Sequence, residues 1–304
     1  MPNSLPPGSF RPAAAAAVFI GLLGLAGWWP VHVALTQGWE IGWNPDGRSA
    51  LLVALMRFGP ALAALFGLAL SQGSLREGFG LAPGRPLYFL PAWFLLPLLA
   101  ALAAALSVLL GLADWDWNMI ASQSDVKLRW SVDKEMLNLA PQGWAVWLAE
   151  ILLGPVVWFL PAWAEETAWR GLLFHWLRRR GFWVTALAGA LLEWAWRFPL
   201  YRAGYAYPDH VGLAPWLGLG FTLLISLVLT WLRAASGAIW APAIARATLS
   251  AGAVIPLALT KDYDSAWAHL QGLTGMGLLM LAVLAFWSLG WLKIEEPEKP
   301  AVGN

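Results

Sequence analysis

The chain has 304 residues, of which 59% are hydrophobic and only 12% are charged. A water-soluble globular domain carries about a quarter charged residues, so this composition excludes an ordinary soluble protein and indicates a chain that lies in lipid. The formal net charge of +1 excludes a nucleic-acid partner, and the absence of cysteine excludes disulfides, thiolate metal ligands and a cysteine nucleophile.

Stretches without charged residues locate the expected membrane spans, because a helix crosses the hydrocarbon core with about 20 apolar residues. The first span, 12–34, lies between Arg11 and Glu40 and is too long for the apolar part of a signal peptide, so a retained helix is expected. The next two spans are 51–70, interrupted only by Arg57, and 86–112, which has no charge.

Charged residues return in 114–135, interleaved with tryptophans, which predicts the longest connection outside the membrane. Five further spans are expected after it: 141–164, 181–198, 211–232, 234–259 and 268–292. The predicted fold is therefore all-α, a polytopic membrane helical bundle with about eight transmembrane helices. It forms one integral membrane domain, 1–304, with three N-terminal spans (1–112), an extramembrane loop (113–142), a core (143–259) and a last span with a tail (260–304).

The distribution of Lys and Arg predicts how the chain lies in the membrane. These residues are more numerous in the connections on the side of the N-terminus, which include Arg178–Arg180 and Arg233. Because positive connections stay in the cytoplasm, both termini are expected there, in an inner membrane. Many of the tryptophans lie near the ends of the expected spans, where aromatic rings meet lipid headgroups.

Eight charged residues remain inside the expected spans or their direct helical continuation. They are four arginines and four glutamates: Arg57, Arg170, Arg197, Arg246, Glu150, Glu165, Glu166 and Glu193. A charge in the bilayer costs a few kcal/mol or more and marks a functional site by default, with a partner expected. Glu166 and Arg170, like Glu193 and Arg197, are four residues apart and so share one helical face. Arg57 is expected to pair with Glu150.

The residues Glu165, Glu166 and Arg170 spell EExxxR, and they are followed by a helix that ends near Phe-Pro and by the segment WAPAIARATLSAG. This order, over about 143–252, resembles the CPBP family of membrane proteins, which includes the CAAX prenyl proteases and bacteriocin-processing or immunity proteins. The resemblance implies a CAAX-protease-like fold around a water-filled cavity. It also implies an intramembrane endopeptidase in which a glutamate of the first motif activates water and histidines of two later motifs complete the site.

The chain departs from the family pattern at both later motifs. Glu193 and Arg197 occupy the positions of Phe and His in the second motif, and Arg246 and Ser250 occupy those of His and Asn in the third. A guanidinium donates hydrogen bonds but cannot serve as a general base or a usual metal ligand. The four histidines stand singly, without HExxH spacing, so no cofactor and no metal are expected.

Three functions stay open. In the first, the protein is an active endopeptidase that cleaves membrane-associated or prenylated peptides: Glu165 activates water, Glu166 is oriented by Arg170, and the arginines of the later motifs hold the carbonyl oxygen. In the second, an inactive member of the family binds a peptide, lipid or protein partner in the cavity, in an immunity or scaffold role. The third is a transporter, against which the lack of an internal repeat counts. Membrane lipids are expected partners in each.

Overall fold

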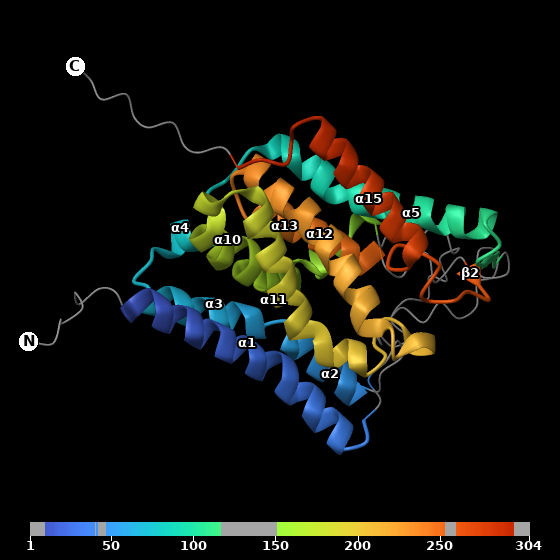
Figure 1. The fold of residues 1–304 in the computed structure, drawn as a ribbon, viewed down its shortest axis with the longest axis horizontal. Coiled ribbons are helices and arrows are strands. Elements are labelled where there is room, and N and C mark those ends of the chain that lie inside the picture. Colours follow the sequence, from blue (N-terminus) through green and yellow to red (C-terminus); the bar gives the residue numbers. More distant parts are fainter. Residues whose placement is uncertain (1–9, 40, 42–46, 117–150, 253–259, 295–304) are drawn as a thin grey trace, which may run out of the picture.

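The computed structural model describes residues 10–39, 41, 47–116, 151–252 and 260–294. Most of these residues are helical, which confirms the all-α prediction (Figure 1). The only strands among them are β1 (Asp114–Trp115) and β2 (Thr260–Lys261), which pair antiparallel with Asp114 opposite Lys261.

The described part before the loop contains the helices of the first three expected spans. They are α1 (Phe10–Thr36), α2 (Gly47–Met56), α3 (Gly59–Leu70), α4 (Leu75–Phe79), the short η1 (Pro86–Tyr88) and α5 (Phe89–Leu109). The expected span 51–70 contains a tight turn at Arg57 and Phe58, between α2 and α3. The turn is needed because Pro60, in the first turn of α3, has no N–H with which to continue the hydrogen bonds of α2.

The second half begins with α8 (Gly154–Val157) and α9 (Phe159–Glu166), which form the described end of the fourth expected span. The chain then continues through the following elements: η2 (Thr167–Leu172), α10 (Leu173–Leu177), η3 (Arg178–Arg180), α11 (Phe182–Arg202), η4 (Pro208–His210), α12 (Ala214–Ser236), α13 (Trp240–Gly252) and α15 (Leu273–Ser288). The loop 117–142 and the first part of the fourth span lie outside the described residues.

Four helical stretches of the described chain are long and apolar enough to cross a membrane: Pro12–Thr36, Leu51–Leu70, Pro86–Leu109 and Ala214–Ser236. They correspond to the first, second, third and sixth expected spans. Helix α15 is apolar but has only 16 residues. The protein is an all-α membrane protein, and the number of eight spans stays a prediction.

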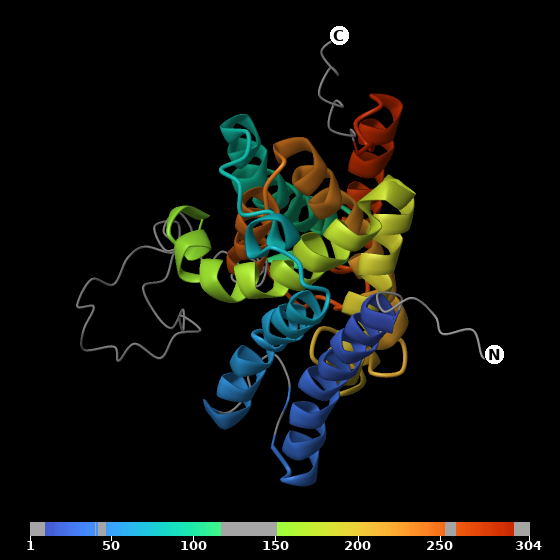
Figure 2. The same cartoon turned by 90° about the vertical axis from the view of Figure 1, so that its left-hand side faces the viewer.

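Apolar surface is distributed as expected for a bundle in lipid. Large hydrophobic side chains are exposed on α1, α3, α5 and α15, for example Leu25, Phe66, Leu98 and Leu281. Helix α12 is much more buried, and it packs against α11, α13 and α15. Figures 1 and 2 show the outer helices on two sides, with α1 and α3 together on one side and α5 and α15 on the other. Helices α11, α12 and α13 lie between them, and this central layer carries Glu193, Arg197 and Arg246 of the charged group described below.

Candidate functional site: a buried cluster of glutamates and arginines

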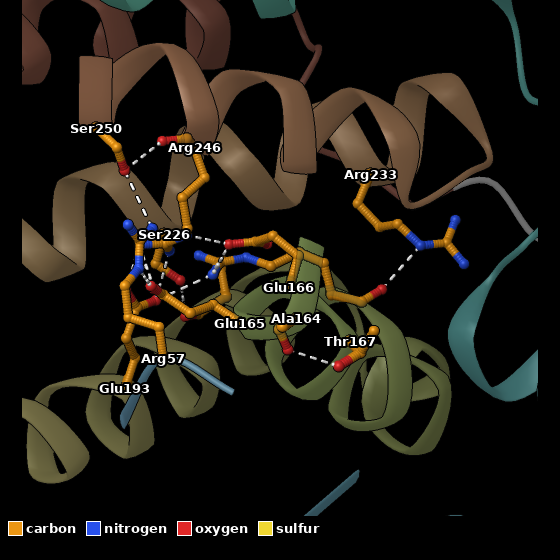
Figure 3. A network of polar contacts seen from close by, with 12 residues as sticks. Arg57, Ala164, Glu165, Glu166, Thr167, Glu193, Ser226, Arg233, Arg246 and Ser250 are labelled. Atoms are coloured by element: carbon orange, nitrogen blue, oxygen red, sulfur yellow. Dashed lines mark hydrogen bonds and ion pairs between the residues drawn. The ribbon is translucent and has the colours of Figure 1, made fainter. Parts of the chain in front are cut away.

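Charged side chains from four parts of the chain meet inside the bundle (Figure 3). The cluster consists of three glutamates and four arginines: Glu165 and Glu166 at the end of α9, Arg170 in η2, Glu193 and Arg197 in α11, Arg246 in α13, and Arg57 in the turn between α2 and α3. All predicted site residues thus lie in one place, together with Arg57. We call this group the Glu/Arg cluster.

The EExxxR motif spans a change in helix type. Glu165 and Glu166 are the last two residues of α9, and the next six residues form the π-helical segment η2. The predicted pair between Glu166 and Arg170 is present, with 3.4 Å between Oε1 and Nη1. Arg170 makes a closer contact with Glu193 of α11, at 3.0 Å between Nη1 and Oε2. The motif arginine therefore joins two helices in addition to its own turn. Short π-helical segments within α-helices, such as η2, are frequent at functional sites.

Glu165 is fully buried, and both of its carboxylate oxygens contact guanidinium groups. Arg57 Nε donates to Oε1, and Arg197 Nη2 donates to Oε2. Arg246 Nη1 lies 3.5 Å from Oε2. Glu165 is therefore surrounded by three positive charges, and the guanidinium groups of Arg57 and Arg197 bond to it directly.

Arg246 holds the other two carboxylates. Its Nε donates to Glu166 Oε1, while its Nη1 and Nη2 lie 2.8 Å and 2.9 Å from the two oxygens of Glu193. Such a two-bond pair between guanidinium and carboxylate is the strongest geometry for these groups. Arg246 thus stands at the centre of the network, in contact with all three glutamates.

The predicted pair on α11 and the predicted site residue Ser250 complete the network. Glu193 Oε1 and Arg197 Nε are 3.6 Å apart, so the predicted pair on α11 is an ion pair without a hydrogen bond. The Oγ of Ser250 accepts a hydrogen bond from Arg57 Nη2 at 3.1 Å and donates one to the backbone oxygen of Arg246 at 3.0 Å. Ser250 therefore links the turn before α3 to helix α13.

One face of the cluster borders a cavity of about 120 Å³. Its charged lining comes from Arg57, Glu165, Glu193, Arg197 and Arg246. Ser250, Thr222 and Gln271 add neutral polar groups, and much of the rest is aromatic or aliphatic. Glu166 and Arg170 lie behind this lining. The side chains of Arg57 and Arg197 are 15% and 24% exposed, whereas that of Glu165 is 0% exposed. The arginines, rather than the carboxylates, therefore face the open space.

Comparison with known families agrees with this arrangement. Residues 146–252 match the family model described as "Type II CAAX prenyl endopeptidase Rce1-like". This part of the chain is similar to the Rce1-like CAAX prenyl endopeptidases. The resemblance to the CAAX proteases expected from the motifs is thereby confirmed, and the matched residues contain the whole Glu/Arg cluster except Arg57. A search of curated proteins found no match to the chain.

None of the four histidines lines the cavity of the Rce1-like region. His210, in η4, bonds to Asp264 at 2.8 Å, and His269 bonds to Thr260 at 2.7 Å on the connection that precedes α15. Among the described residues, no group of three or more His, Cys, Asp and Glu side chains is arranged to hold a metal ion. Independence from a metal stays a prediction.

Arg57 has a partner that the sequence analysis did not name, and Arg233 lies elsewhere than expected. Arg57 contacts Glu165, while its expected partner Glu150 lies outside the described residues. Arg233, expected in an exposed connection, is a buried residue of the last turn of α12. Its Nε donates to the backbone oxygen of Arg170 at 2.9 Å, and its guanidinium lies 4.6 Å from the ring centre of Phe174, apart from the cluster (Figure 3). Arg233 thereby fixes η2 to α12. Helix α12 extends to Ser236, one turn beyond the expected end of the span, which explains the difference.

Proposed function

We propose that the protein is a non-hydrolytic CAAX protease-like membrane protein that holds a membrane-associated ligand in the cavity of the Glu/Arg cluster. The observation that supports this most strongly is the contact of Glu165 with the guanidinium groups of Arg57 and Arg197. Arg197 stands where the resemblance places a catalytic histidine. The same exchange at Arg246 removes the second imidazole.

Proton transfer is the step that this arrangement disfavours. A general base needs a free lone pair within reach of a water molecule. Each oxygen of Glu165 already accepts a charge-assisted hydrogen bond, and a proton on Glu165 would leave two half-buried guanidinium groups without their nearest counter-charge. Arginine stays protonated and cannot take over the role of an imidazole. The two guanidinium groups therefore make Glu165 a weak proton acceptor, while the cavity keeps donors for a ligand.

The second candidate is the endopeptidase itself, acting on membrane-associated or prenylated peptides. The match to the endopeptidase family favours it, and so does the position of Glu165 and Glu193 at the cavity. Arg197 and Arg246 would then hold the developing oxyanion of the peptide carbonyl. This function requires Arg57 or Arg197 to leave Glu165, so that one carboxylate oxygen accepts a proton from water.

Restoring the imidazoles tests the proposal. Wild-type protein and the double variant Arg197→His, Arg246→His are reconstituted in liposomes with membrane-tethered peptides, some prenylated and some not. Cleavage is expected only in the double variant. Arg202→His is the control, since it places an imidazole on an exposed position of the same helix. Turnover by the wild-type protein would overturn the non-hydrolytic function in favour of the endopeptidase.

We also propose that the protein lies in a cytoplasmic membrane with both termini in the cytoplasm. Exposed Arg178–Arg180, at the end of α10, supports this because positive segments remain inside. The chain contains no cysteine, so a single cysteine reports on one position. Arg179→Cys in intact cells is expected to resist a membrane-impermeant thiol reagent, and Lys261→Cys is expected to react. The opposite pattern would reverse the proposed orientation.

A further inference from the structure

The charges of the Glu/Arg cluster do not balance within the described residues. Four guanidinium groups face three carboxylates. Arg170 and Arg246 lie deepest and contact two and three carboxylates respectively. Among the described residues, the two arginines at the cavity, Arg57 and Arg197, share the single carboxylate of Glu165 as their hydrogen-bonded partner. A charge inside a membrane protein is stable only beside a counter-charge or water.

These two arginines have donors to spare. A guanidinium has five N–H groups. Arg57 uses Nε for Glu165 and Nη2 for Ser250, and Arg197 uses Nη2 for Glu165. The Nε of Arg197 is buried without a hydrogen-bond partner among the described residues. The Nη groups of both side chains that remain are suited to the oxygens of an anion, whereas the buried Nε of Arg197 lies beside Glu193 Oε1 at 3.6 Å.

Both guanidinium groups are held in position before any ligand arrives. Arg57 lies 5.2 Å from the ring centre of Trp158, and Arg197 lies 5.2 Å from that of Trp196. Glu165 lies between them and bonds to each. Groups fixed in this way lose little freedom on binding, so more of the interaction energy appears as affinity.

The cavity combines these donors with an apolar wall and a small volume. Leu200, Phe221, Ile225 and Leu249 contribute to its lining. A cavity of about 120 Å³ has room for several water molecules, so it accommodates a compact polar head group. We infer that the cavity binds the oxyanion head of a lipid-like amphiphile, a carboxylate or phosphate that accepts hydrogen bonds from the N–H groups of Arg57 and Arg197 that Glu165 does not use. This inference rests on the proposed ligand-binding function and names the chemistry of the ligand.

Binding of a simple amphiphile tests the inference. Wild-type protein in neutral maltoside micelles is titrated calorimetrically with dodecyl phosphate, with uncharged dodecylglycerol and with inorganic phosphate. Dodecyl phosphate is expected to bind one site per chain, and its affinity is expected to fall as salt is added. Dodecylglycerol is expected not to bind this site, and inorganic phosphate is expected to compete only at much higher concentration.

Matched variants assign the site. Arg57→Gln and Arg197→Gln are each expected to lower the affinity for dodecyl phosphate by about tenfold or more, because each variant loses a charged hydrogen bond to the ligand. Arg202→Gln removes the same charge from an exposed position on α11 and is expected to change nothing. Arg197→Lys keeps the positive charge but lacks the planar guanidinium group, so it is expected to bind dodecyl phosphate with intermediate affinity. This variant also tests the site if Arg197→Gln does not fold.

Three results would overturn the inference: equal binding of dodecylglycerol, equal loss in Arg202→Gln, or inorganic phosphate binding as tightly as dodecyl phosphate. The last would identify a soluble anion as the ligand. The non-hydrolytic function fails on a different result, cleavage of a peptide by the wild-type protein. The two failures are therefore distinguishable on one preparation.

Discussion

Replacement of Arg246 by methionine is expected to destabilise the protein strongly. Arg246 is 3% exposed and contacts Glu165, Glu166 and Glu193, the last through two bonds of 2.8 Å and 2.9 Å. Methionine keeps an apolar stem of similar length but removes the charge, so three buried carboxylates lose a shared partner. Breaking one buried ion pair in this way costs about 3–5 kcal/mol. Arg170 still contacts Glu166 and Glu193, which keeps the expected loss within that range.

The free energy of unfolding of the reconstituted protein, measured by steric trapping in bicelles, checks this value. The control Arg202→Met changes an exposed arginine and should stay within about 0.5 kcal/mol of the wild type. The double variant Arg246→Met, Glu193→Leu should lose less than the sum of the single variants, with a coupling of about 0.5–3 kcal/mol. A loss below about 1 kcal/mol in Arg246→Met would refute the reasoning that Arg246 neutralises the cluster.

Two further predictions concern the surroundings of the cluster. Gly80 has φ +67° and lies against Arg233, whereas Gly237 has φ +75° and an added methyl group there would meet open space. Gly80→Ala should therefore lower the free energy of unfolding more than Gly237→Ala does. Equal losses would refute the contact with Arg233. Burial lowers the pKa of His269 to about 4, below the value of 6.5 for a free histidine. The unfolded chain therefore binds a proton that the folded chain does not, and stability should fall by about 3 kcal/mol as the pH decreases from 6.5 to 4. His269→Asn should flatten this dependence, exposed His32→Asn should not, and unchanged slopes in both would contradict the prediction.

Much of the cluster was predictable because charges inside apolar stretches are rare and need partners. The spacing of four between Glu166 and Arg170 indicated one helical face, and the later motifs pointed to Glu193, Arg197 and Arg246. The structure brings all of them together. What made this possible is that both the helical period and the cost of an intramembrane charge are local properties of the sequence.

The position of Arg57 was not predictable in the same way. Its contact with Glu165 depends on how α3 packs against α9 and η2, and spacing along the chain carries no such distance. The π-helical segment after Glu166 was also missed, because it is stabilised by tertiary contacts such as the bond from Arg233 to the backbone of Arg170. The signal available for Arg57 was its isolation as the single charge between 51 and 70.

The rate of peptide cleavage by the wild-type protein and by Glu165→Gln, measured side by side in liposomes, tests the central claim most directly. If guanidinium groups occupy both oxygens of Glu165, the wild-type protein should cleave no membrane-tethered peptide faster than the variant does. Cleavage by the wild-type protein that disappears in Glu165→Gln would contradict the claim and establish Glu165 as a working base.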